Sequence, residues 1–409
     1  LATETTGIAF KGKTNYGGGI CIDQIEIVEN GLVSLFVKSI KASNFAYPNA
    51  PSGSNNNPIL RTIVNVVGNT GSLALTDISF VSKNTDDSDV VNGGLSLYYS
   101  KDTLLSNVVL LATGKDFNAG KVDFTGLNRT LSFGQNVFWL TYNLTDQNVR
   151  QRHNHVLDAM VEADAIVIGG ATYPYDDLDP SGSQFYKEAL YFDNFEMGLP
   201  WALSGDFEIG EPLGQGSASA ANPDPSMAVS PGNVLGNDLS GDGLYDNDLP
   251  ALFSIAESKH VNVNYYKQLS VNFWRWLNVD YFDDVSIGAR RNSNNWGNVW
   301  VNNNYNRDNY WSVYNYSIHD TLSYRDSLQV RFTLGATDEE NNQSGWNIDN
   351  FAILGNYISY DVGVIALLAP FDGCGHTTET QVGIQIKNFG GEDIPTGIPV
   401  RYSINGGAW

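Results

Sequence analysis

The sequence alternates bulky and polar side chains over runs of strand length, most clearly in VNFWRWLNVDYFDDVSIG, which begins at Val271. Successive side chains of a β-strand point to opposite faces, so a period of two predicts half-buried strands. Similar short runs, bounded by Gly, Asn, Asp or Ser, recur from residue 58 onward, and no long helical periodicity appears. These patterns predict an all-β protein of serial β-sandwich domains.

The chain length predicts several domains, because 409 residues are too many for one hydrophobic core. The expected parts are the last strands of an upstream jelly-roll-like domain at 1–29, an Ig-like β-sandwich at 30–180, a jelly-roll sandwich at 185–356 and the first half of an Ig-like domain at 357–409. Residues 19–27 and 345–353 share the pattern G-x-x-I-D-x-x-x-I, which indicates an internal repeat. We therefore expect jelly-roll and Ig-like sandwiches in a chain truncated at both ends.

The balance of charges limits the partners. Lys and Arg number 23 and Asp and Glu number 45, so the formal net charge is −22. A field of this sign repels nucleic acid and anionic membranes and favours divalent cations. No apolar run approaches the roughly 20 residues that a bilayer-spanning helix needs. We expect no nucleic-acid partner and no membrane span.

The two cysteines, Cys21 and Cys374, lie near opposite ends of the chain. A bridge between them would require those ends to meet, which we do not expect. Cys374 stands in the turn-like run FDGCGHTTET, where it is either a free thiol or one half of a disulfide with a cysteine beyond Trp409.

Several runs resemble modules of secreted bacterial proteins. PILRTIVNVVGNTGSLALTDISF, GLSLYYSKDT, GQNVFWLTYNLT and VEADAIVIGGATY, within 58–175, resemble the β-sandwich at the N-termini of BNR-type sialidases. That module is non-catalytic, and it recurs in proteins exported by the type IX secretion system. GDFEIGEP, NPDPS, NVLGNDLSGDG, FWRWLNVDYFDD, SNNWGNVW and GWNIDN, within 190–356, resemble MAM-like, concanavalin-type jelly rolls appended to peptidases and adhesins of the same bacteria. The run after Ile358 resembles the Ig-like modules that follow such jelly rolls.

A calcium site is one candidate functional feature. Calcium takes six to eight oxygen ligands, and glycines let backbone carbonyls converge on it. The run NDLSGDGLYDND places four carboxylates in one loop, at Asp238, Asp242, Asp246 and Asp248. Such closely spaced charges repel one another unless a cation or solvent screens them. The loop is therefore either a structural calcium site or a solvated acidic turn.

The jelly-roll resemblance implies a second calcium site. It would join the first strand, near Glu196 and Asp206, to Asp349 on the last strand. A third candidate is the pair His153 and His155, which would share a face if their run were a strand. No third ligand is evident beside the two histidines, so the sequence favours a solvated strand edge there.

The run from Asn294 to Tyr316 combines seven Trp and Tyr residues with many Asn. Flat rings and amides suit a glycan-binding face, with Trp296, Trp300 and Trp311 as the candidate contacts. The same alternation also describes one buried aromatic row with polar residues facing out, and we favour that interpretation. Thr103, Thr321 and Ser327 stand in Asp-Thr/Ser-Leu triplets, which resemble the O-glycosylation pattern of type IX-secreting bacteria.

Enzymatic motifs are absent from the sequence. It contains no G-x-S-x-G elbow, H-E-x-x-H motif or P-loop. We predict a non-catalytic structural or adhesive segment, a stalk or fibre, of a large secreted or cell-surface bacterial protein. Its partners would be neighbouring domains or subunits of the same surface assembly, and glycans in addition. The alternative is a set of accessory domains of a secreted hydrolase, peptidase or sialidase, or a carbohydrate-binding module.

Overall fold

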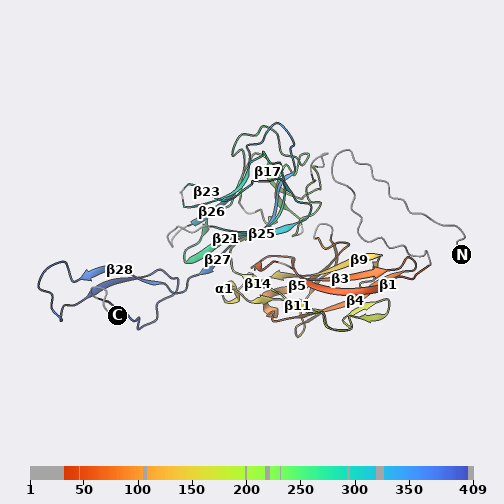
Figure 1. Cartoon of the computed structure of the whole chain (residues 1–409), viewed down its shortest axis with the longest axis horizontal. Coiled ribbons are helices and arrows are strands. Elements are labelled where there is room, and N and C mark those ends of the chain that lie inside the picture. The colour runs from red at the N-terminus through yellow and green to blue at the C-terminus, as the bar shows by residue number, and fades with distance from the viewer. Residues whose placement is uncertain are drawn as a thin grey trace, which may run out of the picture.

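The structure, a computed structural model, describes residues 32–45, 47–104, 108–198, 200–216, 222–230, 232–292, 295–318 and 327–403. The strands expected at 1–29, Cys21 and Thr321 lie outside these residues. The described chain forms two β-sandwiches and a β-hairpin (Figure 1). The predicted all-β class is confirmed, and the helical segments described are η1 (Asp87–Asp89) and α1 (Val149–Arg152). Within the described part of the chain, no helix has the length and hydropathy that crossing a bilayer requires.

The first sandwich has two main sheets and one small sheet. One main sheet has the order β1 (Phe36–Asn44), β3 (Asn57–Val67), β9 (Gly134–Leu144), β5 (Val90–Ser100) and β6 (Val109–Lys115). The other has the order β11 (Ala159–Met160), β4 (Leu73–Ser82), β12 (Ile166–Ile168) and β13 (Ala171–Tyr173), with β7 (Lys121–Phe124) and β8 (Arg129–Leu131) also paired to β4. The small sheet joins β10 (Val156–Leu157), β14 (Gln184–Lys187) and β2 (Asn49–Pro51). Alternate residues of these strands fill one core, which includes Leu60, Phe80, Phe138 and Tyr142.

The second sandwich is built around the long strands β21 (Tyr266–Val279) and β27 (Gly345–Tyr357). Its seven-stranded sheet has the order β17 (Phe207–Gly210), β18 (Val234–Asn237), β27, β21 and β24 (Asn306–Arg307), with β15 (Ala189–Asp193) on β27 and β25 (Ser312–Ser317) on β21. The six-stranded sheet has the order β16 (Ala202–Ser204), β19 (Ser254–Glu257), β26 (Ser327–Leu334), β22 (Val285–Arg291) and β23 (Gly297–Val301), with β20 (Val261–Asn262) on β26.

The alternation in β21 explains how the two sheets pack. Phe273 points into the core and meets Phe332 of the six-stranded sheet, with ring centroids 5.2 Å apart. Trp274 and Trp276 point to the opposite face and are 5% and 6% exposed. Both faces of this strand are therefore buried, although the alternation alone predicts a half-buried strand.

The segment 222–230 covers part of that outer face. The indole N–H of Trp276 donates to the carbonyl oxygen of Pro223 at 3.0 Å, and that of Trp311 to the carbonyl oxygen of Met227 at 2.9 Å. Asp224, 3% exposed, accepts from the side-chain amide of Asn347 at 2.5 Å. The covering segment thus accepts hydrogen bonds from three side-chain donors of this face, the indoles of Trp276 and Trp311 and the amide of Asn347.

The boundary between the sandwiches lies later than the sequence suggested. β14 pairs with both β2 and β10, so the first sandwich extends to Lys187, beyond the expected end at 180. β15 begins the second sandwich at Ala189. The Asp-, Pro- and Gly-rich run before β14 does form a loop, but that loop returns the chain to its own domain.

The two sandwiches pack directly against each other. The ring of Phe45, from the first, stacks on Trp274 at 5.7 Å between centroids. The backbone N–H of Ala189 donates to the hydroxyl of Ser52 at 3.0 Å, and the side-chain amide of Asn350 donates to the carbonyl oxygen of Asn55 at 3.3 Å. A stacked apolar contact flanked by hydrogen bonds favours one fixed orientation of the two domains.

A second contact joins both sandwiches to the C-terminal hairpin. The guanidinium carbon of Arg150 lies 3.5 Å from the ring centroid of Tyr357. Arg150 also lies within 3.9 Å of Glu188 and within 3.5 Å of Glu392, and the Tyr266 hydroxyl donates to Glu188 at 2.6 Å. We call these five residues the Arg150 junction.

The hairpin consists of β28 (Val362–Ala369) and β29 (Gly383–Asn388). Its apolar side chains are largely exposed, with Val364 at 60% and Leu367 at 64%. An isolated two-stranded hairpin is only marginally stable, so its base depends on the Arg150 junction. Cys374, in the loop between β28 and β29, is exposed and has no disulfide partner among the described residues.

Replacing Arg150 by Ala should loosen the hairpin. The variant loses one cation–π contact and two partly exposed ion pairs, together worth about 1 kcal/mol. We expect small-angle X-ray scattering to show a broader distribution of dimensions than in the parent. Arg401→Ala, which removes an exposed arginine from the hairpin region, is the control. Identical scattering from both variants and the parent would show that the Arg150 junction does not fix the hairpin.

Candidate functional site

Three exposed aromatic rings meet at one end of the second sandwich. Tyr281 and Phe282 lie between β21 and β22 and are 50% and 69% exposed, and Tyr305, between β23 and β24, is 53% exposed. The ring centroids of Tyr281 and Phe282 are 5.1 Å apart, and those of Tyr281 and Tyr305 are 5.9 Å apart. We call these three residues the aromatic cluster.

Buried polar groups fix the loops that carry the aromatic cluster. Asp280, 2% exposed, accepts from the backbone N–H of Tyr281 at 2.5 Å. A side-chain hydrogen bond to Asp280 raises the pKa of the Tyr305 hydroxyl. The side-chain amide of Asn302 donates to the carbonyl oxygens of Asp280 and Asp283 at 3.5 and 3.4 Å, which ties one loop to the other. The rings therefore stand on a preorganised base.

Amide groups and one guanidinium surround Tyr305. Asn303 and Asn304 are exposed, and Asn306 donates through its side-chain amide to the carbonyl oxygen of Asn304 at 3.1 Å. The guanidinium carbon of Arg307 lies 5.2 Å from the centroid of the Tyr305 ring. Flat apolar rings bordered by amide donors and acceptors can stack on one face of a sugar and hydrogen-bond to its hydroxyls.

Sequence reasoning missed two members of the aromatic cluster. Tyr305 belongs to the Asn- and aromatic-rich run that suggested glycan binding, but Tyr281 and Phe282 do not. Their signal is the run DYFDD, which places two adjacent aromatic residues among acids directly after a strand. Two adjacent aromatic residues among acids lack the alternation of a buried strand, which indicates that at least one of the two rings faces solvent.

Trp296, one of the three predicted glycan contacts, lies on the outer face of the six-stranded sheet. The guanidinium carbons of Arg290 and Arg331 lie 4.6 and 4.3 Å from its ring centroid. The two arginines therefore occupy the indole, which leaves less of it for a ligand.

Trp300 and Trp311 pack into two further places. Trp300 contacts the core and its ring centroid is 5.7 Å from that of Trp346. Trp311 is 3% exposed on the outer face of the seven-stranded sheet, beneath Met227. The structure therefore does not bring the three predicted tryptophans onto one face. Trp300 and Trp311 both pack against other residues, but on different faces of two sheets, so they do not form the single buried row that we favoured.

The predicted calcium loop folds around its own backbone. Asp238 accepts from the backbone N–H groups of Asp242 and Gly243 at 3.0 and 3.1 Å. Asp206 joins the loop, and burial and then the charge of Asp246 raise its pKa. One carboxylate oxygen of Asp206 is buried without a hydrogen-bond partner. Asp248, the last acid of the loop, is exposed. An oxygen of this kind fits a cation, so this loop remains the better of the two predicted calcium sites.

The residues of the second predicted calcium site lie at opposite ends of β18. Glu196 accepts from the backbone N–H of Asn233 at 2.7 Å, directly before β18, and Asp349 lies on β27 beside that end. Asp206 lies at the other end, where its carbonyl oxygen accepts from the backbone N–H of Asp238. A strand rises about 3.3 Å per residue, so the five steps from 233 to 238 separate the two ends by about 16 Å.

The carboxylate of Asp349 is already occupied by hydrogen bonds from the protein. Its carboxylate accepts from the N–H and hydroxyl of Ser230, both at 2.7 Å, from the N–H of Asn350 at 2.6 Å, and from the backbone of Val229. Four donors match the roughly four acceptor positions of a carboxylate. Asp349 therefore anchors the covering segment, and these contacts do not fit a calcium ligand.

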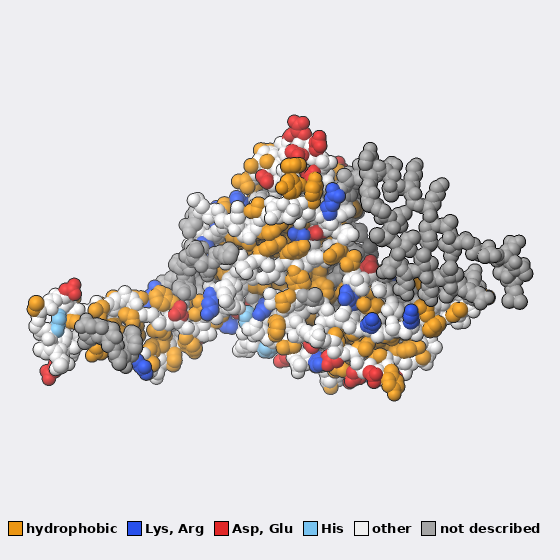
Figure 2. All heavy atoms as spheres, in the orientation of Figure 1, with side chains coloured by type: hydrophobic (Ala, Val, Ile, Leu, Met, Phe, Trp, Pro, Cys, Tyr) orange, Lys and Arg blue, Asp and Glu red, His pale blue; other side chains and the backbone are white. Residues whose placement is uncertain are grey.

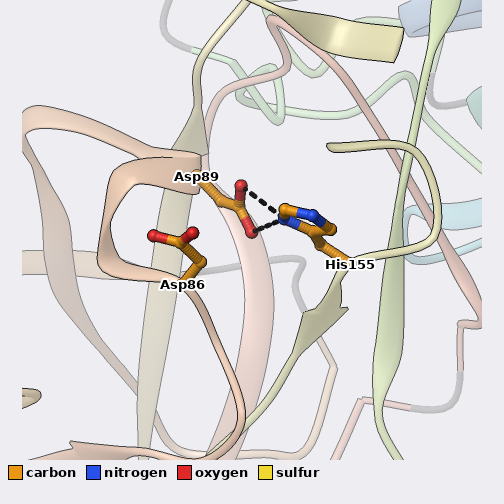
Figure 3. A group of neighbouring side chains, drawn as sticks. All are labelled: Asp86, Asp89 and His155. Atoms are coloured by element: carbon orange, nitrogen blue, oxygen red, sulfur yellow. Dashed lines mark hydrogen bonds and ion pairs between the residues drawn. The ribbon is translucent and has the colours of Figure 1, made fainter. Parts of the chain in front are cut away.

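Among the described residues, one group brings three potential metal ligands within 4.8 Å of one another, Asp86, Asp89 and His155 (Figure 3), and it is neither of the two predicted calcium sites. The Nδ1 atom of His155 lies 3.1 Å from both carboxylate oxygens of Asp89. Arg152 also donates to Asp89, at 2.6 Å, and Asp86 accepts from the hydroxyl and N–H of Ser88. A guanidinium already compensates the buried carboxylate, so this group is an ion-pair network that ties α1 to η1.

His153 does not join His155. Its Nδ1 atom accepts from the backbone N–H of Glu188 at 3.2 Å, and burial lowers its pKa. The two histidines bind different partners because α1 ends between Arg152 and His153, so their run is not a strand.

The two described glycosylation candidates are half-buried. Thr103 lies in the turn after β5, and its carbonyl oxygen accepts from Arg61 at 3.2 Å. Ser327 begins β26, and its hydroxyl donates to the side chain of Asn292 at 3.3 Å. Their modification remains a prediction.

Comparison with known proteins finds structural similarity only. No family model matches the chain, and no curated protein matches it. The chain is similar to the CBM22-1–CBM22-2 tandem domain of Paenibacillus barcinonensis Xyn10C, with 8% identity over 79% of this chain and 93% of that chain and a TM-score of 0.27. It is also similar to truncated AlyQ with CBM32 and alginate lyase domains, with 8% identity over 80% of this chain and 99% of that chain and a TM-score of 0.18. TM-scores this low carry no argument about function.

Calcium should stabilise the parent chain through the loop at Asp206, Asp238 and Asp246. An ion that binds only the folded state raises its melting temperature by mass action. We expect millimolar calcium to raise the transition measured by scanning calorimetry, and Asp238→Asn to abolish that rise. Asp176→Asn, an exposed acid of the first sandwich, is the control. Equal transitions in calcium and in EDTA would remove the predicted site.

The buried acids of the covering face should make stability depend on pH. Burial raises the pKa of Asp224 and of Asp349 to about 7, from the ordinary value of 3.8. Between these values the folded chain holds more protons than the unfolded chain, so the free energy of unfolding falls as the pH rises from about 4 to about 7. A rise of about three pH units corresponds to at most about 4 kcal/mol for each carboxyl.

Asp224→Asn tests this dependence, because Asn mimics the neutral acid. Urea unfolding at pH 4.5 and 7.5 should show a smaller loss of stability in this variant than in the parent. Asp176→Asn should leave the loss unchanged. If Asp224→Asn and the parent lose the same free energy over this range, Asp224 is ionised in the folded chain throughout.

Proposed function

We propose that this chain is a non-catalytic, glycan-binding segment of a secreted or cell-surface protein, and that the aromatic cluster contacts the sugar. One observation carries the proposal. Tyr281 contacts both Phe282 and Tyr305, and the three rings, exposed to between 50% and 69%, stand on loops fixed by hydrogen bonds.

Contact between these apolar rings and water is unfavourable, and a bound ligand would remove part of that contact. Large apolar groups gathered on a surface commonly mark an interaction site, whereas single exposed ones do not. The C–H face of a pyranose can cover an aromatic ring, and its hydroxyls can reach the amides of Asn303 and Asn304. Rings that are already fixed lose little conformational freedom on binding.

Two acids near the aromatic cluster support the loops and are not placed for hydrolysis. Asp280 and Asp283 are 2% and 1% exposed. Asp280 accepts from the N–H of Tyr281, and Asp283 accepts from the hydroxyl of Tyr245 and from the N–H of Asp338. Glycoside hydrolysis needs two carboxyls that face a substrate cleft, so these contacts support a binding role.

A second candidate function is that of a rigid spacer, the stalk or fibre reading. The stack of Phe45 on Trp274 and the Arg150 junction favour it, because they fix three modules relative to one another. Such a unit would present the aromatic cluster at a defined position. The two roles are compatible, and the net charge of −22 suits a soluble surface protein.

Binding to a glycan array tests the proposal. The parent chain should bind at least one glycan, and Tyr281→Ala and Tyr305→Ala should each weaken that binding about tenfold, which corresponds to about 1.4 kcal/mol per ring. Tyr175→Ala removes a ring that is 94% exposed on the first sandwich and is the matched control. A parent that binds no glycan, or variants that bind as well as the parent, would refute the assignment.

A further inference from the structure

We infer that the aromatic cluster takes uncharged sugars, and that a rim of carboxylates around it excludes uronic, sialic and sulfated sugars. The inference rests on the proposed function and adds the chemical class of the ligand. The contacts among four loops at this end of the second sandwich carry it.

The four loops contain acids and no basic residues. Residues 238–250 hold four Asp, residues 280–284 hold three, residues 302–306 hold none, and residues 335–344 hold three acids. The four loops together hold ten carboxyls and no Lys or Arg. The acidic side chains of the uppermost end of the molecule are visible in Figure 2. The exposed members are Asp242, Asp246, Asp248, Asp284, Glu339 and Glu340.

Hydrogen bonds hold the four loops together beside the rings. The backbone N–H of Asp248 donates to the carbonyl oxygen of Asp338 at 3.0 Å, and the side-chain amide of Asn247 to that of Glu339 at 3.1 Å. The backbone N–H of Asp338 donates to the carboxylate of Asp283 at 2.9 Å, one residue from Phe282. The acids of 338–340 therefore belong to the same surface as the aromatic cluster, and we call them the acidic rim.

The field of the acidic rim reaches Tyr305. The hydrogen bond and charge of Asp280 and the effect of burial raise the pKa of the Tyr305 hydroxyl, Arg307 lowers it, and the charge of Asp338 raises it by less than these. The screening length is about 8 Å at physiological ionic strength, so a carboxylate on a sugar stacked here would feel several of these charges. Like charges placed against each other disfavour the wrong partner, whereas a neutral sugar is unaffected.

Arg307 lies beside the aromatic cluster, and its charge works against this repulsion. It lies over the ring of Tyr305, and it directly follows a loop that has no acid of its own. One guanidinium against the three carboxyls of the acidic rim leaves the local field negative. Arg307 can still donate to a sugar hydroxyl, which a neutral ligand also offers.

The test compares neutral and anionic oligosaccharides of equal length, such as cellohexaose and hexagalacturonate, on an array that also carries sialylated and sulfated glycans. EDTA is present throughout, so that no divalent cation bridges a carboxylate to the acidic rim. The proteins are the parent, the triple variant Asp338→Asn/Glu339→Gln/Glu340→Gln, and Asp176→Asn as the control.

We expect the parent to bind the preferred neutral glycan at least tenfold more tightly than its anionic counterpart at low salt. The triple variant, or 0.5 M NaCl with the parent, should reduce that preference severalfold and leave neutral binding unchanged. Anionic glycans that bind the parent as tightly as neutral ones, or a preference that the triple variant does not change, would overturn the inference. If the parent binds no glycan, or if Tyr281→Ala and Tyr305→Ala bind glycans as tightly as the parent, the proposed function is overturned instead.

Discussion

The burial of β21 and β27 on both faces is the constraint on which the rest of the molecule depends. In β27, Trp346 and Ile348 enter the core, so the alternate residues Asn347 and Asp349 face the other way. That side is covered too, and a buried polar group that lacks a hydrogen-bond partner there destabilises the folded state. Asp224 and Ser230 of the covering segment supply those partners, which couples the segment to the sheet.

The same outer face joins the domains. Trp274 leaves the core because of its position in β21, and Phe45 of the first sandwich covers it. An interface built on a central strand of one domain restricts motion between the two sandwiches. At the far ends of the long strands the chain is free of this packing requirement. The loops there carry carboxylates and exposed rings that a core would not tolerate.

The sequence predicted the all-β class and the strand runs, because alternation and turn residues are local signals. It predicted that Trp300 and Trp311 pack against other residues, but not that they pack on different faces of two sheets. It failed where distant segments meet. Glu196 and Asp206 contact opposite ends of β18, about 16 Å apart. Asp349 accepts hydrogen bonds from Ser230, which is far from it in the sequence. The spacing of residues along the sequence shows neither arrangement. The aromatic cluster likewise joins two loops that lie apart in the sequence, so a single run of residues could not show it.

Hydrogen–deuterium exchange of the whole chain with and without a bound neutral oligosaccharide tests the central claim most directly, because it locates the ligand without any substitution. The account predicts slower exchange in residues 280–284 and 302–307, and no change in residues 289–300 around Trp296 and Trp300 or in the first sandwich. Protection at Trp296, or in the first sandwich, with none at Tyr281 and Tyr305, would contradict it.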